Sequence, residues 1–350
     1  MNNINIKELV RDNILKLQPY SSARVEYEGD ANIWLDANEN PFGLRYNRYP
    51  DPFQCELKKV LSTIKNVSSK QIFIGNGSDE VIDLLIRVFC EPGIDSIITF
   101  NPSYTMYITS ATINNARVRE FLLTEEFQIP LTVLKQNREN TDKLLFICTP
   151  NNPIGNLIPL SVIEQVCRLF TGIVVVDEAY LDFSNSDSAI KLLDKYNNLF
   201  IVQTLSKAYG MAGLRLGIGI GNPEIIEILN RIKPPYNVSQ STQDLVLDRL
   251  NYLPEIKTHI QLLIKERNLL YNNLIQLSFF NRVFESEANF ILVQTPHYKE
   301  LYDFLCSKGI VVRIRNIPPS LLHGLRLTVG LPVENKKLME SLLLFKRRIK

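Results

Sequence analysis

Short apolar runs alternate with helical patterns from about residue 70 to residue 220. Seven runs have the length and composition of buried strands: 71–74, 96–100, 117–121, 143–148, 173–177, 199–204 and 214–219. Between several of them apolar residues recur at helical spacing, as in residues 79–90 and 160–170. This alternation predicts an α/β domain with a mostly parallel sheet covered by helices on both faces.

The pattern changes after about residue 230, where Pro234-Pro235 interrupts the chain. A long helical stretch continues to about residue 277. An apolar run (289–294), a helix (299–308), two strand-like runs (309–314 and 324–329) and a final helix follow. We therefore expect a large α/β domain over residues 31–250 and a smaller α+β domain over 251–350.

Residues 1–30 form a separate N-terminal segment in this prediction. Its apolar residues recur at helical spacing and predict a short amphipathic helix: Ile6, Leu9, Val10, Ile14 and Leu17. Charges interrupt every apolar stretch there, so the segment does not have the character of a signal peptide.

Composition narrows the class of protein. The 350 residues suit two domains, and the formal net charge of +2 gives no bias toward nucleic acid or a membrane surface. The basic cluster Lys346-Arg347-Arg348 suits the solvated end of a helix. No apolar run reaches the length of about 20 residues that a membrane span needs. We expect no nucleic-acid partner and no membrane association.

The cysteines and histidines bear on compartment and metal chemistry. Five widely spaced cysteines without CxxC spacing favour free thiols in a reducing cytoplasm. The three histidines form no HExxH or other close His/Cys group, so we expect no metal site.

Polar motifs follow several predicted strands. Because open α/β sheets bind ligands at the carboxyl ends of their strands, these motifs are candidates for a site. Gly75-Asn76-Gly77-Ser78-Asp79-Glu80 follows the first strand and opens a helix, where backbone N–H groups can hold an anion. A tight turn with Ser or Asp as N-cap explains the same residues. The third glycine of a dinucleotide-binding fingerprint is missing.

Three more motifs close the set. Asn151-Asn152-Pro153 has an ordinary turn as its alternative. Asp177, at the end of an apolar strand, suits a metal ligand, a helix cap or the partner of a protonated nitrogen, and taken singly the helix cap is favoured. Lys207 follows the strand at 199–204, with Ser206 and Arg215 offering a hydroxyl and a cation for a phosphate. A lysine whose amine is kept neutral there attacks a carbonyl to form a Schiff base, whereas a typical loop lysine stays in solvent.

Together and in this order, the motifs resemble the fold-type I enzymes that use pyridoxal 5'-phosphate (PLP), the aspartate aminotransferase superfamily. The resemblance covers about residues 18–330. Within the superfamily the chain is similar to the histidinol-phosphate aminotransferases, through residues 35–43, Arg48-Tyr49-Pro50, 75–80, 177–183 and 204–217. The Asn38-Glu39-Asn40-Pro41 motif and the Lys207 segment are specific when they occur together.

The resemblance implies a role for each cofactor residue. Lys207 would bind PLP and, once released, move a proton between Cα and C4'. Asp177 would pair with the pyridine nitrogen, Asn152 and Tyr180 would bind the phenolic oxygen, and Tyr104 would stack on the ring. The phosphate would be held by Ser78, Asp79, Ser206 and Arg215, and by Tyr49 from a second subunit of a homodimer with shared active sites.

On the substrate side, Arg326 matches the arginine that clamps the acidic end of the substrate. A guanidinium suits both a carboxylate and a phosphate, so one pocket can serve glutamate and histidinol phosphate in turn. Asn152, Arg313 and Tyr20 are further candidates, with a surface arginine and a turn tyrosine as equal alternatives for the last two. The chain departs from the family at Ile154, where threonine is usual.

The resemblance implies amino transfer between L-histidinol phosphate and 2-oxoglutarate, giving imidazole acetol phosphate and glutamate, in histidine biosynthesis. Alternatives on the same scaffold are a threonine-phosphate decarboxylase of cobalamin biosynthesis and an aromatic amino acid aminotransferase. A regulatory module with a PLP-type fold is a further alternative, but such modules carry a fused DNA-binding region, and no helix-turn-helix is evident before the first strand.

Overall fold

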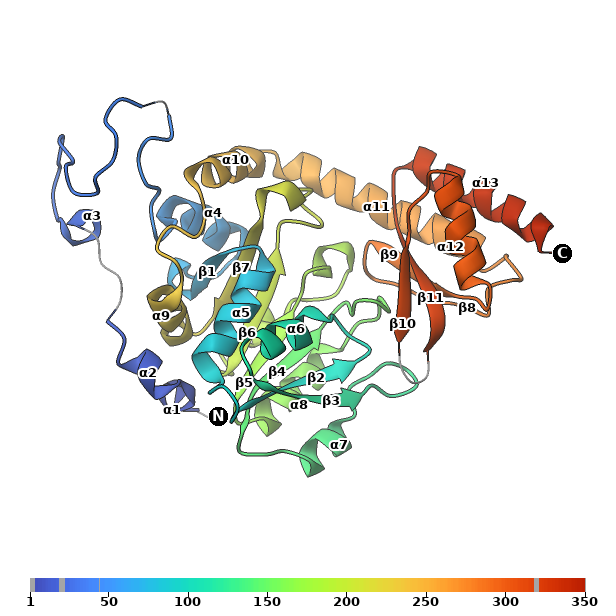
Figure 1. Ribbon diagram of the computed structural model, residues 1–350, viewed down its shortest axis with the longest axis horizontal. Helices are drawn as coiled ribbons and strands as arrows, with labels where there is room; N and C mark the ends of the chain where they lie inside the picture. The colour runs from blue at the N-terminus through green and yellow to red at the C-terminus, as the bar shows by residue number, and fades with distance from the viewer. Residues whose placement is uncertain (1–3, 19–22, 44, 318–320, 350) are drawn as a thin grey trace.

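A seven-stranded sheet forms the centre of the computed structural model, which describes residues 4–18, 23–43, 45–317 and 321–349 (Figure 1). Its strand order is β1-β7-β6-β5-β4-β2-β3. The bounds are β1 Ile72–Asn76, β2 Ser96–Asn101, β3 Arg117–Leu122, β4 Asp142–Cys148, β5 Ile173–Asp177, β6 Leu199–Thr204 and β7 Leu216–Gly221. All seven predicted strands are present, and each observed strand end lies within two residues of the predicted end.

The sheet is mostly parallel, as predicted. Strands β2 to β6 pair in parallel, while β7 pairs antiparallel with both β6 and β1. β7 begins two residues later than predicted because residues Ala212–Leu214 form a 3-10 helix and Arg215 adopts a left-handed conformation with φ 53°.

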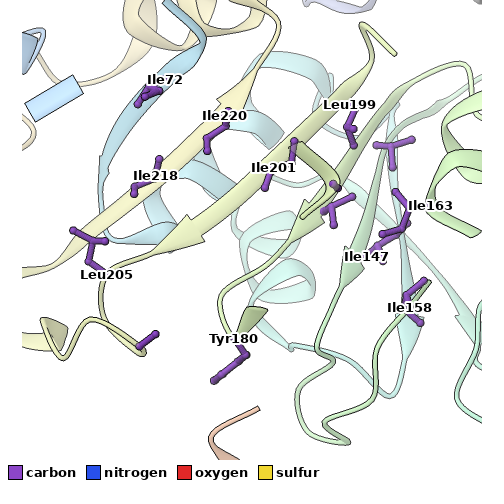
Figure 2. Packing of buried hydrophobic residues seen from close by; sticks show 14 of the residues in the cluster. Ile72, Ile147, Ile158, Ile163, Tyr180, Leu199, Ile201, Leu205, Ile218 and Ile220 are labelled. Atoms are coloured by element: carbon purple, nitrogen blue, oxygen red, sulfur yellow. The ribbon is translucent and has the colours of Figure 1, made fainter. Parts of the chain in front are cut away.

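Both faces of the sheet are buried except at the edge strand β3, which explains the apolar runs of the inner strands. Alternate side chains enter two separate clusters, so that Val174 and Val176 of β5 pack on one face and Ile173 and Val175 on the other. Figure 2 shows the first face, where Ile147 of β4, Ile201 of β6 and Ile218 of β7 pack in one layer.

Amphipathic helices cover the two faces. Their buried residues recur every three or four positions, as in Ile163, Val166 and Cys167 of α8. The helices of this part are α4 Cys55–Lys65, α5 Ser78–Phe89, α6 Met106–Ile113, α7 Leu131–Gln136, α8 Leu160–Leu169, α9 Pro223–Ile232 and α10 Gln240–Leu250. Residues of α5, α6 and α9 join the cluster of Ile173, and residues of α4, α8 and α10 join that of Val174.

The predicted N-terminal amphipathic helix is wrong in extent. Two single turns, α1 Ile6–Leu9 and α2 Asp12–Leu15, take its place. Arg11 interrupts them in an extended conformation, because its amide donates to Val88 O at 3.0 Å and its Nε pairs with Glu91 at 2.9 Å. Contacts with the body of the protein thus override the helical pattern.

Residues 23–43 and 45–50 form an arm that stands away from the sheet (Figure 1). Its one helix is α3 Ala23–Glu26. Ion pairs organise it internally, since Glu39 accepts from Arg24 and from Arg48, the latter at 2.7 Å.

A second sheet, of order β10-β11-β9-β8, lies in the C-terminal part and is entirely antiparallel. Its strands are β8 Arg282–Val283, β9 Phe290–Gln294, β10 Arg313–Ile317 and β11 Leu321–Thr328. Helices α12 Tyr298–Ser307 and α13 Pro332–Arg348 pack on it.

The long helix α11, Leu253–Leu274, leads from the side of the large sheet to the second sheet (Figure 1). The helical stretch predicted up to residue 277 is therefore two helices. It breaks at Asn251-Tyr252, and Pro254 lies in the first turn of α11, where its missing N–H costs nothing.

Candidate active site

A cavity of about 200 Å³ lies at the carboxyl ends of the central strands. Strand ends and the loops that follow them supply its walls, and two side chains come from the second sheet. Its lining residues are Ser78, Asp79, Tyr104, Cys148, Asn152, Asp177, Ala179, Tyr180, Thr204, Ser206, Lys207, Ala212, Arg215, Arg315 and Arg326. Nine residues predicted for cofactor binding and the predicted substrate residue Arg326 are among them.

Asp177 ends β5 on the floor of this cavity, and only 3% of it is exposed. Its Oδ2 accepts from the Tyr107 hydroxyl at 2.7 Å and its Oδ1 from the Ala179 amide at 3.0 Å. Burial raises the pKa of this carboxyl to about 6, against the lowering effect of the Tyr107 hydrogen bond. No residue that the structure describes forms an ion pair with it. A protonated ring nitrogen supplies the counter-charge that such a buried carboxylate lacks.

Lys207 lies on the loop after β6 and borders the same cavity. Its Nζ is 5.9 Å from the centroid of the Tyr180 ring. Partial burial, together with the positive charges of Arg326 and Arg215, lowers the pKa of the Lys207 amine. A lowered pKa favours the neutral, nucleophilic amine that Schiff-base formation requires.

A polar cradle closes one end of the cavity. Gly77 is the N-cap of α5 with φ 83°, so the first-turn amides of Ser78 and Asp79 belong to a helix N-terminus. Neither Ser78 nor Asp79 caps this helix, so the explanation of the motif as a tight turn with Ser or Asp as N-cap is wrong. A Cβ on Gly217 of β7 would lie 2.3 Å from the Ser78 nitrogen, so only glycine lets this strand approach the turn.

Arg215 completes the cradle beside Gly77 and Ser206. A Cβ on Gly77 would lie 2.6 Å from Arg215 Nη2, which shows how closely the guanidinium lies against the turn. Its only hydrogen bond to a residue that the structure describes is a 3.4 Å contact with Ala212 O. Helix amides, a hydroxyl and a guanidinium without a carboxylate partner fit a phosphate group. The residues present therefore fit PLP at both its ring and its phosphate.

Asn152, on the loop after β4, contacts side chains from both parts of the molecule, Tyr180 beside the large sheet and Arg326 on the second sheet. Its Nδ2 lies 3.4 Å from the Tyr180 hydroxyl, and its Oδ1 accepts from Arg326 Nη1 at 2.7 Å. Burial raises the pKa of Tyr180 to about 12, which keeps its hydroxyl protonated and able to donate. Tyr104, on the loop after β2, lines the cavity and donates to Asp79 at 3.1 Å.

Two arginines of the second sheet face the cavity, Arg326 on β11 and Arg315 on β10. Neither forms an ion pair with an acidic residue in the described part of the chain, and the Nε of each is buried without a partner. Arg313 is exposed on β10, opposite Arg326, and does not line the cavity. Sequence reasoning missed Arg315, although its place two residues after Arg313 puts both on one face of the strand.

Other predicted residues lie outside this cavity. Tyr20 falls outside the described residues. Tyr49 stacks on Tyr236 with ring centroids 4.5 Å apart, in a separate hollow beside the arm. Ile154 is buried in a small apolar cluster with Phe127, Phe284 and Leu292, which accounts for an apolar residue where threonine is usual.

Two further observations bear on the class of protein. Among the described residues no group of three His, Cys, Asp or Glu side chains is placed to bind a metal ion. None of the helices in the described ranges combines the length and apolar character that crossing a bilayer demands.

A mostly parallel sheet that presents a lysine, a buried aspartate and a phosphate cradle at its carboxyl edge defines the fold-type I PLP enzymes. The chain belongs to the aminotransferase class I and II family, whose pattern matches residues 31–342. It is thus a PLP-dependent aminotransferase, and the predicted resemblance, fold class and cofactor are confirmed.

Relatives and solved structures agree with this membership. The histidinol-phosphate aminotransferase of Parabacteroides distasonis is 46% identical, over 97% of this chain and 98% of that protein. That of Bacteroides thetaiotaomicron is 47% identical, over 96% and 98%. The crystal structure of the histidinol-phosphate aminotransferase from Clostridium acetobutylicum matches with a TM-score of 0.79 at 26% identity, covering 89% of this chain and 98% of that one.

A fourth match concerns the fold alone. The enzyme from Sinorhizobium meliloti, solved in complex with pyridoxal-5'-phosphate, has a TM-score of 0.80 at 22% identity and covers 90% of both chains.

Proposed function

We propose that this enzyme transfers an amino group between L-histidinol phosphate and 2-oxoglutarate, yielding imidazole acetol phosphate and glutamate in histidine biosynthesis. Relatives of that name share 43–47% identity with nearly the whole chain. The observation that carries the proposal is the pair Arg315 and Arg326 on the cavity wall near Lys207, without acidic partners in the described chain. Two guanidinium groups suit a phosphate in one half-reaction and a carboxylate in the other.

Each cavity residue has a task in this proposal. When bound, PLP supplies an electron sink for negative charge that develops on the substrate's α carbon. Asp177 holds a proton on the ring nitrogen, and Asn152 and Tyr180 bind the phenolic oxygen. The face of the Tyr104 ring supports the cofactor ring, and the cradle of Ser78, Asp79, Ser206 and Arg215 binds the phosphate.

Lys207 performs the proton transfer. Its Nζ would hold the cofactor until the substrate amine displaces it, and the freed amine would then move a proton from the substrate's α carbon to C4' of the cofactor. The cationic neighbours Arg326 and Arg215, which lower the pKa of the amine, favour the neutral form that accepts this proton. Arg326 orients the substrate from the wall formed by the second sheet, with Tyr20 as a further proposed contact, whereas Arg313 could contribute only from outside the cavity.

A direct assay tests the substrate. Purified protein with PLP, L-histidinol phosphate and 2-oxoglutarate should form glutamate at a rate that depends on both substrates, whereas phenylalanine as amino donor should be used more slowly. Release of carbon dioxide from phosphothreonine, without glutamate formation, would show a decarboxylase instead.

We also propose that the enzyme is a homodimer in which the arm completes the partner's active site. Three large apolar side chains of the arm support this: Ile33, Leu35 and Phe42 are 77%, 92% and 91% exposed. Apolar surface of this kind marks an interaction site. In the proposal, Tyr49 binds the cofactor phosphate of the other subunit.

Mixed dimers test this arrangement. A Tyr49→Phe subunit and a Lys207→Ala subunit are each impaired alone, but a mixture of the two should recover part of the activity. The recovered activity would come from the site that combines intact Lys207 with intact Tyr49 of the partner. A fully active monomer would contradict the shared site.

We place the enzyme in the cytoplasm and keep the division into residues 1–30, 31–250 and 251–350 as a proposal. All five cysteines are free, three of them buried, which suits a reducing compartment. The separate apolar cluster around the second sheet supports a small C-terminal domain.

A further inference from the structure

Tyr107 does not line the cavity, yet its hydroxyl donates to Asp177 Oδ2 at 2.7 Å, the shorter of the two hydrogen bonds that this carboxyl accepts from the described residues. Its ring is fully buried. It stacks on Phe146 with ring centroids 4.7 Å apart and meets Tyr104 edge to face at 5.5 Å. Aromatic packing on two sides thus fixes where the hydroxyl points.

The hydroxyl remains a donor at every working pH. Burial and the charge of Asp177 raise the pKa of Tyr107 well above its ordinary value, so it does not ionise. A hydrogen bond to a charged acceptor favours the charged form. The Tyr107 hydroxyl therefore opposes the effect of burial, which favours protonation of Asp177.

The other groups that face Asp177 come from several elements. They are Asp79 on α5, Cys148 on β4, Tyr104 after β2, Tyr180 after β5 and Lys207 after β6. The negative charge of Asp79 disfavours the ionised form of Asp177, whereas the positive charge of Lys207 favours it. Burial raises the pKa of the Cys148 thiol far above its ordinary value, so it adds no charge. Of the protein groups around Asp177, Tyr107 makes the largest contribution in favour of the ionised form.

We propose that Tyr107 is a positioning residue for Asp177, whose carboxylate it holds ionised and in place for the cofactor's ring nitrogen. The inference rests on the proposed role of Asp177. Without the Tyr107 hydroxyl, Asp177 takes up a proton itself, its attraction for a protonated ring nitrogen falls, and the cofactor binds less tightly.

The test compares Tyr107→Phe with Tyr196→Phe. Both remove the hydroxyl of a buried tyrosine that donates to a carboxylate, but Tyr196 bonds to Glu164 at 3.0 Å, away from the cavity. The first measurement uses the protein without cofactor, so neither the substrate nor the cofactor assignment enters it.

The free energy of unfolding is measured against pH. Asp177 has a folded-state pKa of about 6 against 3.8 for a free side chain, so stability falls as pH rises from about 4 to 6 and then levels off. Loss of the Tyr107 hydroxyl raises the pKa of Asp177 further, so in Tyr107→Phe the decrease in stability should extend to a pH about one unit higher. In Tyr196→Phe the decrease should end at the same pH as in the parent protein. An unshifted fall in Tyr107→Phe would overturn the inference.

The second measurement is the dissociation constant of PLP at pH 7, which should rise about tenfold in Tyr107→Phe and stay unchanged in Tyr196→Phe.

If Tyr107→Phe alone does not fold, Asp177→Asn in the same chain should restore folding, because no buried charge then needs the donor. Absence of that rescue would overturn the inference. If Asp177→Asn alone binds PLP as tightly as the parent, the proposed role of Asp177 fails, while the pH shift in Tyr107→Phe still reports on the contact itself.

Discussion

Arg326 on β11 donates a hydrogen bond from Nη1 to Oδ1 of Asn152, 2.7 Å away and 174 residues earlier in the chain. The bond links the second sheet to the Asn-Pro loop after β4. Arg326 Nε is left without a hydrogen-bond partner in the described chain, although it is buried. One edge of the guanidinium is thus anchored while donor capacity remains for a ligand, which costs less conformational entropy on binding than recruiting a free side chain.

The first prediction concerns this arginine. Arg326→Lys keeps the charge but loses the planar fork that holds Asn152 and the substrate's anion together. We expect kcat/KM to fall about 100-fold for both histidinol phosphate and glutamate, since two charge-assisted hydrogen bonds are lost. Arg87→Lys is the control, because Arg87 forms a half-exposed ion pair with Asp83, and its kcat/KM should equal that of the parent enzyme. An Arg326→Lys enzyme with parental kcat/KM would show that Arg326 does not hold the substrate.

The second prediction concerns the phosphate cradle. Gly217→Ala places a Cβ 2.3 Å from Gly77 C and Ser78 N, so the turn has to move. Such overpacking costs roughly 1–3 kcal/mol, and we expect PLP affinity to fall at least about tenfold. Gly213→Ala is the matched control, because a Cβ there has no atom within 4 Å. Equal PLP affinity in the two variants, measured by fluorescence titration, would contradict the cradle.

The third prediction concerns pH and the arm. Ion pairs with Arg24 and Arg48 lower the pKa of Glu39 to about 2, from 4.5. A lowered acid pKa means that this contribution to the arm's stability is complete above about pH 4.5 and is lost as pH falls toward 2. The Tyr49 amide donates to Glu39 at 2.6 Å, and its hydrogen-exchange protection should follow that loss.

In Glu39→Gln we expect protection at Tyr49 to be about tenfold lower at pH 7 and nearly independent of pH, because the charge-assisted bonds are gone. Glu26→Gln alters an exposed glutamate of the same arm and should leave the parental profile. A parental profile in Glu39→Gln would mean that other contacts order the arm.

The sequence was sufficient for most of the large sheet because six of its strands are buried on both faces and therefore read as apolar runs, whereas the edge strand β3 is largely exposed. It failed where contacts between distant residues decide the outcome, as at Arg11, which leaves the helical pattern to pair with Glu91. β8 has only two residues, too few for any period. The break before Pro254 was readable, since proline belongs in a first helical turn.

The cofactor side of the site was predictable because each residue follows a strand end in a fixed motif, and all of these except Tyr49 line one cavity. Arg315 and Tyr107 were missed for different reasons. Arg315 and Arg313 share a strand face, and only the three-dimensional fold decides which reaches the cavity. A tyrosine within an apolar helix such as α6 gives no sign that its hydroxyl reaches Asp177, on a strand 70 residues later.

The central claim is that the Lys207 amine carries the cofactor. The purified protein with PLP should show a visible absorbance band, and borohydride should remove the band and leave the cofactor attached to one peptide. Mass spectrometry should place that adduct on Lys207, while Lys207→Ala should give no adduct and lose essentially all transaminase activity. An adduct of equal yield in Lys207→Ala, or on another lysine of the parent enzyme, would contradict the account.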